Sequence, residues 1–318
     1  MRYLIFLLTV GLLGWFIYTR QEDLLQMPGY LQRVGFGSAA ALLSLEFLFL
    51  LLVAQSNRLV YRSIGVRNRL FDQLQLLLAA GTIERLLPSA GAAGMGSYVW
   101  LARRRGIDVS DSVKMTATTF VLGYAQIVPL LLIPIFYMDT FHLPPEQSKL
   151  LIGISAGFVI LVIGLAAWIG SKEMNSRIEK WAWLSRFPRV LAGIGPIHDH
   201  VRLSWRRRRK LVAPLLFLWA LYPVRIAMLW VCFRAFDSTV SLPLILTGYS
   251  VTILISFLTF LPTTLGVFEL TMVGTLSALG VATDLATAVT VLYRLVTYWS
   301  PIPFGLLSWW NLQRRSGA

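Results

Sequence analysis

Long apolar runs, separated by short polar or basic connections, dominate the hydropathy pattern of this chain. A run of about 20 apolar residues is long enough to cross a bilayer as a helix. The first run is followed by Thr19-Arg20-Gln21, which offers no small-residue cleavage site, so we expect a retained helix and not a signal peptide. The pattern predicts an all-α polytopic membrane protein with about six spanning helices, at 2–18, 34–55, 115–138, 149–170, 211–233 and 286–312.

Two further apolar segments, 71–102 and 242–281, do not fit single spans. Each is interrupted by a proline, and in each the arm after the proline is too short to cross. A proline removes a backbone donor and disfavours helix in the residue before it. In hydrocarbon such a break is tolerated only where protein or a water-filled cavity satisfies the freed groups. We therefore predict two re-entrant helical hairpins, with tip residues Pro88, Gly91, Gly94, Pro262 and Gly266.

Lysine and arginine placement assigns the two sides of the membrane. The connections 56–70, 103–114 and 171–210 and the C-terminal tail are basic, whereas 139–148 and 234–241 carry almost no cations. Basic loops remain in the cytoplasm. With that orientation both termini are cytoplasmic, the first hairpin starts and ends inside, and the second starts and ends outside. The hairpins are thus predicted to enter from opposite faces.

The same layout contains an internal repeat within a single integral membrane domain, residues 1–318. Residues 34–138 form one unit of span, hairpin and span, and residues 211–312 form another that runs in the opposite direction. Inverted units with paired broken segments are typical of transporters, and they place the substrate where the units meet. Between the units lies a basic, aromatic-containing linker, 171–210, whose composition suits a helix in the headgroup layer.

Composition and charge narrow the class of partner. The chain has 56% hydrophobic and 14% charged residues, against about 25% charged in soluble domains. Its net charge of +14 comes from cations beside the apolar runs, which favours anionic lipid over nucleic acid. The single Cys232 excludes an intramolecular disulfide and is expected to be a buried apolar residue. His198 and His200 alternate with Asp199 and do not share a helix face, so we expect no metal site and no cofactor.

Six ionisable residues fall at membrane depth in this layout: Glu46, Glu84, Arg85, Arg225, Glu269 and Arg294. Each would cost about 2.5–3.5 kcal/mol at a lipid-facing helix centre, so most should face one another or water. Arginine binds phosphate through a bidentate fork. We therefore expect Arg294 and Glu269 to contact or counterbalance a lipid phosphate. Arg225, Arg85 and Glu84 are further candidates, whereas Glu46 is better explained by a structural ion pair.

Three stretches of the second unit carry a resemblance to a known family. They read Leu261-Pro-Thr-Thr-Leu-Gly-Val-Phe-Glu269, Leu279-Gly-Val-Ala-Thr-Asp-Leu-Ala286 and Leu292-Tyr-Arg-Leu-Val-Thr-Tyr-Trp-Ser-Pro301. They resemble the lysylphosphatidylglycerol synthase transmembrane region family of flippase-like proteins, whose pattern is Pro-x-x-x-Gly-x-x-Glu, a Leu-Gly-Val bend and Tyr-Arg-x-x-Thr-Tyr-Trp-x-Pro. The first unit matches more loosely, since it has Gly94-Met-Gly-Ser-Tyr98 where the family usually has an acidic residue and an arginine.

The resemblance implies lipid translocation without synthesis, because larger members carry a soluble aminoacyl-transferase domain and we expect none in this chain. It adds Tyr293 and Tyr298 to the candidate headgroup-binding residues. The expected function is that of a flippase of the bacterial inner membrane, without enzymatic activity, that moves a phospholipid or a polyprenyl-phosphate-linked lipid. The chain lacks the Gly-x-x-x-x-Gly-Lys-Ser/Thr motif for ATP. Any active transport would therefore use an ion or lipid gradient, with Glu84 or Glu269 as a proton carrier.

Two alternatives stay open. Glu22 and Asp23 follow the first span on the outer side, as acidic catalytic residues do in polyprenyl-phosphate-dependent glycosyltransferases, although the outer loops are short for a sugar-donor domain. The chain could instead be a non-transporting partner of a lipid-modifying enzyme. The partners that we expect are an anionic lipid and the membrane, with a second copy of the chain or a lipid-synthesis enzyme as further candidates.

Overall fold

The computed structural model describes residues 34–86, 92–137, 209–258 and 266–314, with a few isolated positions elsewhere. All regular structure in these ranges is helical, which confirms the predicted all-α class. Several predicted features lie outside the described residues or almost entirely outside them. They are the helices at 2–18 and 149–170, the linker 171–210, and the tip residues Pro88, Gly91 and Pro262.

The first half of the described chain forms four helices: α4 (Phe36–Ser63), α5 (Leu70–Leu86), α6 (Ala92–Arg104) and α7 (Val109–Tyr137). Helix α4 continues two turns beyond the predicted span, although these turns are polar. Their polar groups are satisfied within the protein, because Ser56 donates to the carbonyl of Pro214 over 3.1 Å and Tyr61 donates to Ser112 Oγ over 3.2 Å. Intramolecular hydrogen bonds therefore extend the helix past its apolar stretch.

The second half forms α11 (Arg209–Trp219), α12 (Leu221–Ala235), α13 (Leu242–Leu258), α14 (Val267–Ala278), α15 (Thr283–Arg294), the π-helical turn η3 (Leu295–Trp299) and α16 (Pro301–Arg314). Two predicted spans are thus broken. A proline lacks the N–H and its ring meets the carbonyl four residues back. Pro223 disturbs Trp219 in this way at the α11–α12 break, and Pro301 disturbs Thr297 in η3. In η3 the backbone widens, and Ser300 N–H donates to the Leu295 carbonyl five residues back over 2.9 Å.

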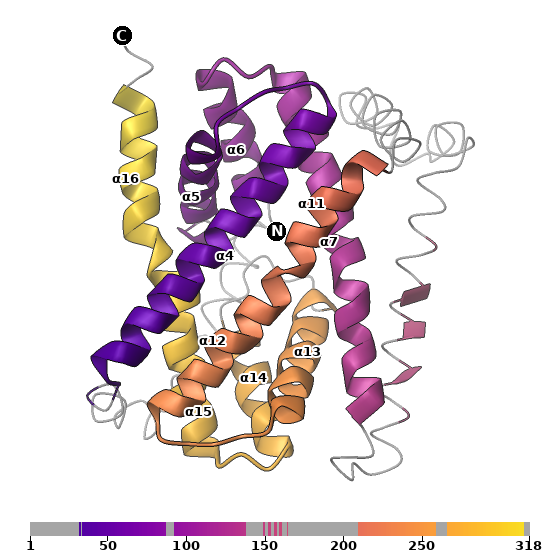
Figure 1. Cartoon of the computed structure of the whole chain (residues 1–318), viewed down its shortest axis with the longest axis vertical. Coiled ribbons are helices and arrows are strands. Elements are labelled where there is room, and N and C mark those ends of the chain that lie inside the picture. The colour runs from indigo at the N-terminus through magenta and orange to yellow at the C-terminus, as the bar shows by residue number, and fades with distance from the viewer. Residues whose placement is uncertain are drawn as a thin grey trace, which may run out of the picture.

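The leading helices of the two halves, α4 and α11–α12, run in opposite directions through the molecule (Figure 1). Helix α4 crosses the molecule diagonally, and α11–α12 run back alongside it with extensive contacts. The pair α5–α6 lies at the end where α4 finishes, whereas α13–α14 lie at the opposite end, where α12 finishes. Helix α16 packs along α5, so the last helix of the second half closes against the first half. The candidate site described below lies where these halves meet.

Helix α4 has two different faces. The buried face includes a charged residue, and the opposite face is apolar and exposed. Leu42 and Glu46, one turn apart, are almost fully buried, whereas Leu43 and Phe47 are more than half exposed. Among the described residues, two helical stretches, Phe36–Ser63 and Arg209–Ala235, are long and apolar enough to cross a membrane. A core helix of a soluble protein would bury such a surface. The exposed apolar face of α4 is instead what lipid contact requires.

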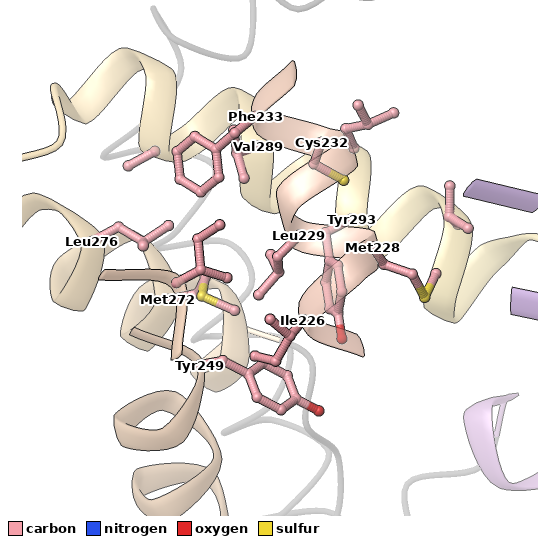
Figure 2. Close-up of a cluster of buried hydrophobic side chains, with 14 of the residues drawn as sticks. Ile226, Met228, Leu229, Cys232, Phe233, Tyr249, Met272, Leu276, Val289 and Tyr293 are labelled. Carbon is pink, nitrogen blue, oxygen red and sulfur yellow. The ribbon is translucent and has the colours of Figure 1, made fainter. Parts of the chain in front are cut away.

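The main apolar core lies among α12, α13, α14 and α15 (Figure 2). Met272 and Leu276 of α14 point toward Leu229 and Phe233 of α12, and Tyr249 approaches from α13. Cys232 is fully buried in this cluster and forms no disulfide, as expected from the sequence. This packing holds the helices that carry the ionisable residues of the second half.

Candidate functional site

The ion pair between Glu269 and Arg294 is the best-defined polar contact of the second half. Glu269 is the third residue of α14 and Arg294 is the last residue of α15. Arg294 Nε donates to Glu269 Oε1 over 2.6 Å, and the two side chains are 10% and 8% exposed. The other carboxylate oxygen, Oε2, accepts the backbone N–H of Gly266 over 2.7 Å. Both oxygens are thus occupied, and the carboxylate lies at a helix N-terminus, which favours negative charge.

Gly266 makes this arrangement possible through its backbone. Its φ of 82° lies in the left-handed region, which residues other than glycine rarely adopt. In this conformation it precedes the first turn of α14 and turns its N–H toward Glu269. The predicted hairpin-tip glycine therefore also positions the carboxylate.

The Arg294 guanidinium has further N–H donors that this ion pair does not use. Its guanidinium carbon lies 4.9 Å from the centre of the Phe268 ring and 4.5 Å from the centre of the Tyr298 ring. Its Nη2 is buried and has no acceptor among the described residues. Cation–aromatic contacts compensate part of the loss of hydration of a buried arginine, worth about 2 kcal/mol when desolvated. They do not replace a hydrogen-bond acceptor for Nη2.

A second buried ion pair joins the two halves of the molecule. Arg225 Nη1 of α12 donates to Glu46 Oε2 of α4 over 2.7 Å, and the two residues are 9% and 3% exposed. The Arg225 guanidinium lies 3.5 Å from the centre of the Phe49 ring, one turn after Glu46. Glu46 therefore forms the ion pair that was expected of it. Its second oxygen, Oε1, is buried and accepts no hydrogen bond from any described residue.

The two pairs are linked by a continuous stack of arginines and aromatic rings. Tyr293 has its ring 5.9 Å from the Arg225 guanidinium carbon, and it stacks on Phe268 with centres 5.9 Å apart and an angle of 10° between the planes. We call this stack the arginine–aromatic row. In order it contains Phe49, Arg225, Tyr293, Phe268, Arg294, Tyr298 and Arg85.

Arg85 ends the row on the side of the first half. Its guanidinium carbon lies 5.9 Å from the centre of the Tyr298 ring, and the Tyr298 hydroxyl donates to the Arg85 carbonyl over 2.8 Å. Among the residues that the structure describes, no carboxylate pairs with Arg85. Glu46, Arg225 and Arg294 all lie close enough to act on its charge. Arg85 thus brings an additional positive charge to the row.

Glu84, next to Arg85 in the sequence, faces another way. Its carboxylate lies directly over Gly94 of α6, where a Cβ on the glycine would overlap it. Because Gly94 has no side chain, α5 and α6 can approach closely with the carboxylate between them. Among the predicted site residues, Glu84 and Gly94 therefore form a contact within the first hairpin.

The structure brings most of the predicted headgroup residues into the row: Arg85, Arg225, Tyr293, Arg294 and Tyr298, with Glu269 beside them. Sequence reasoning missed Phe49 and Phe268, which stack on the arginines. Phe49 was three residues from Glu46 on one helical face, and Phe268 preceded Glu269, so their spacing could have signalled both. In the described ranges no three His, Cys, Asp or Glu side chains come together as a metal site would need.

Comparisons with known proteins place this architecture in a family. The sequence profile of the lysylphosphatidylglycerol synthase TM region family matches residues 3–305. Two UPF0104 membrane proteins of Methanothermobacter thermautotrophicus are 26% and 24% identical to the chain, over 75% and 80% of it and 73% and 79% of their own length. A UPF0104 membrane protein of Pyrococcus horikoshii is 22% identical over 70% of the chain and 71% of its own length. The chain is therefore a membrane protein that belongs to the lysylphosphatidylglycerol synthase transmembrane region family.

Proposed function

We propose that this protein moves an anionic lipid across its membrane and binds the phosphate headgroup at the arginine–aromatic row. The observation that carries the proposal is the excess of cationic donors there, of which Arg225 and Arg294 are buried and Arg85 is half-buried. Arg294 Nη2 has no acceptor and Arg85 has no carboxylate partner among the described residues. Arginines at membrane depth are costly and usually mark a substrate path. Phosphate oxygens would supply the missing acceptors through charge-assisted hydrogen bonds.

The position of the row supports transport. It takes Phe49 and Arg85 from the first half of the chain and its other members from the second half. Inverted-repeat transporters hold their substrate at this kind of interface and move one repeat against the other. A headgroup bound by residues of both halves would therefore be carried when the halves move.

The placement of exposed tryptophans supports re-entrant hairpins that enter from opposite faces. Trp100, Trp310 and Trp230 each stack on an arginine four residues later, at 4.0, 4.7 and 5.2 Å, in the last turns of α6, α16 and α12. Tryptophan and arginine concentrate at membrane interfaces. Helices α6 and α16 finish at one end of the molecule and α12 at the other (Figure 1). The three pairs thus suggest two interface levels, with α5–α6 reaching inward from one and α13–α14 from the other.

The loop 64–69, with Arg67 and Arg69, and the last turn of α6, with Arg103 and Arg104, lie at the end that we assign to the cytoplasm. With this orientation we propose that both termini lie inside the cell and that the protein resides in the cytoplasmic membrane. A lipid suits the site better than a soluble anion, because exposed apolar surface such as that of α4 offers an acyl chain a path beside the headgroup site.

Transport is a better proposal than catalysis for these residues. Glu46 and Glu269 are both held in ion pairs with arginine, which lowers their value as a general base or nucleophile. The acidic pair Glu22 and Asp23, which suggested a glycosyltransferase, lies outside the described residues. The proposed protein is thus not an enzyme, and its partner is the lipid itself.

Reconstitution tests the proposal. Purified protein in vesicles containing fluorescent phosphatidylglycerol should expose the inner-leaflet label to dithionite faster than protein-free vesicles do. Arg294→Ala should slow this exchange by about 10- to 100-fold, the size of one lost charged hydrogen bond, and Arg294→Lys should retain part of it. Arg314→Ala, which removes an arginine stacked on exposed Trp310, is the matched control and should behave like the wild type.

Three results would contradict the proposal or a part of it. Exchange no faster than in protein-free vesicles would favour a non-transporting partner of a lipid-modifying enzyme. Formation of a glycosylated product from a lipid-linked sugar would favour the enzyme. Full exchange by Arg294→Ala would leave Arg294 with a structural role only.

A further inference from the structure

The Glu46–Arg225 pair lies at the crossing of the two halves. Glu46 is on α4, the first helix of the first unit, and Arg225 is on α12, in the first span of the second. These helices pack against each other over a long stretch (Figure 1). Any movement of one unit against the other must therefore either carry this pair along or separate it.

Glu46 is held more loosely than Glu269. Glu269 has a donor on each oxygen, whereas Glu46 accepts one hydrogen bond from Arg225, and its buried Oε1 has no donor among the residues that the structure describes. At 3% exposure, Glu46 has little contact with solvent to compensate. Among the described residues, Arg225 alone donates a hydrogen bond to this buried carboxylate.

A bound phosphate would change that dependence. Arg225 belongs to the row that we propose for the headgroup, and phosphate competes with a carboxylate for the same guanidinium fork. The phosphate also adds negative charge beside Glu46, and a nearby like charge favours the neutral form of a carboxyl group. A buried carboxylate whose partner is removed is strongly destabilising, by about 3–5 kcal/mol, whereas a protonated one is not charged.

We infer that Glu46 takes up a proton when an anionic headgroup binds at Arg225, so that lipid and proton cross the membrane together. The proton comes from the solution on the loading side, bonds to a Glu46 oxygen, and leaves to the other side when the headgroup departs and the Arg225 pair re-forms. For a lipid with one negative charge the coupled step moves no net charge. This inference rests on the proposed function, and it assigns the proton to Glu46 in place of Glu84 or Glu269.

Other charged and titratable groups lie on the helices that pack against α4, and two tyrosines that act on Glu46 lie on α13 and α15. Glu46 interacts electrostatically with Arg225 and Arg85, and also with the hydroxyls of Tyr249 and Tyr293. Tyr298 lies on η3, which also contacts α4. On α7 and α11 the charged residues lie in the first two turns; they are Asp111, Lys114, Arg209 and Lys210.

A pH gradient across vesicles tests the inference. With fluorescent phosphatidylglycerol as the probe, coupling of one proton to one lipid predicts about a tenfold accumulation of the label in one leaflet for a one-unit pH difference. The leaflet facing the less acidic solution should gain the label, and the final distribution, read with dithionite, is independent of the rate. Glu46→Gln cannot release or bind the proton, so its label should distribute equally. Asp111→Asn, a carboxylate change at the Lys114 pair on α7, is the matched control and should accumulate label like the wild type.

The outcomes separate the two proposals. Wild-type protein that moves no lipid at equal pH overturns the proposed function. Wild-type protein that moves lipid but distributes it equally under the gradient overturns proton coupling alone, and gradient-driven accumulation by Glu46→Gln overturns the role of Glu46. If Glu46→Gln moves no lipid, a second measurement decides whether Glu46 carries the proton: proton uptake when phosphatidylglycerol is added to the detergent-solubilised protein. Uptake by the wild type that is lost in the variant supports the inference. Uptake that persists in the variant overturns it.

Discussion

The two hairpin helix pairs, α5–α6 and α13–α14, each lie near one glutamate and one arginine, yet the charges are arranged differently. Near α14, Glu269 and Arg294 form a closed pair, with Gly266 donating to the second carboxylate oxygen. Near α5, Glu84 lies against Gly94, and Arg85 reaches the Tyr298 ring without a carboxylate partner among the described residues.

Helix ends explain this difference. Glu269 lies in the first turn of α14, where unpaired N–H groups stabilise a negative charge. Glu84 lies in the last turn of α5, where the helix dipole disfavours a carboxylate and favours the neighbouring Arg85. The comparison indicates that the second helix pair holds its carboxylate in a closed ion pair, whereas the first carries an arginine that has no carboxylate partner among the described residues.

The largest expected effect is on the closed pair. Glu269→Ala should lower the free energy of unfolding by about 3–5 kcal/mol, because it leaves Arg294 buried and uncompensated. Glu84→Ala should lower the free energy of unfolding by only about 1 kcal/mol, because both ion pairs that the row's arginines form in the described chain stay intact. Thermal unfolding in detergent, followed by the fluorescence of the chain's 11 tryptophans, measures both.

A double variant makes this comparison sharper. Replacing Arg294 as well as Glu269 removes the uncompensated charge, so it should recover part of the lost stability. Equal losses for Glu269→Ala and Glu84→Ala would show that the two hairpins hold their carboxylates equally, and would remove the distinction drawn above.

A medium effect is expected at the helix contact of the first hairpin. Gly94→Ala places a Cβ on the Glu84 carboxylate and should cost about 1–3 kcal/mol through overpacking. Gly96→Ala lies two residues on, with no atom within 4 Å of its new Cβ, and is the matched control. The loss at Gly94 should shrink in a Glu84→Ala background. Similar stabilities for the two glycine variants would show that α5 and α6 do not meet at this point.

Single cysteines should have the smallest effect on stability, within about 0.5 kcal/mol at exposed sites, and they test whether α5–α6 and α13–α14 each return to the face from which they start. In a Cys232→Ala background, Arg62→Cys and Arg104→Cys flank the first hairpin, and Thr239→Cys and Ala282→Cys flank the second. An impermeant maleimide applied to whole cells should label only the second set. Labelling of Arg104→Cys but not Arg62→Cys would mean that α5–α6 cross the membrane.

The helical segments were largely predictable from the sequence, because hydropathy and proline act locally. The arms predicted within 71–102 and 242–281 correspond to α5–α6 and α13–α14, and Gly266 immediately precedes α14. The breaks inside two predicted spans were not foreseen. Pro223 and Pro301 were visible, but a proline in an apolar helix can produce a kink, a π-turn or a full break, and the packing around it selects among them.

The site was predictable in its residue types and less so in its pairing. Resemblance to the family directed attention to Glu269 and Arg294, which are near in the sequence and bonded in the structure. Glu46 and Arg225 are 179 residues apart, and nothing local joins them. Their pairing follows from the crossing of α4 and α12. The aromatic members Phe49 and Phe268 became recognisable only once the arginines were placed.

The sequence alone determined that this chain is a helical membrane protein of a known family, with charges that a bilayer would not accept unpaired. These properties follow from composition, spacing and the cost of burying ions, which do not depend on how the helices pack. Tertiary structure decided which charge meets which. It joined the two halves through Glu46 and Arg225, closed Glu269 on Arg294, and left Arg85 without a carboxylate among the described residues. Pairing depends on contacts between distant segments, so only the folded chain could specify it.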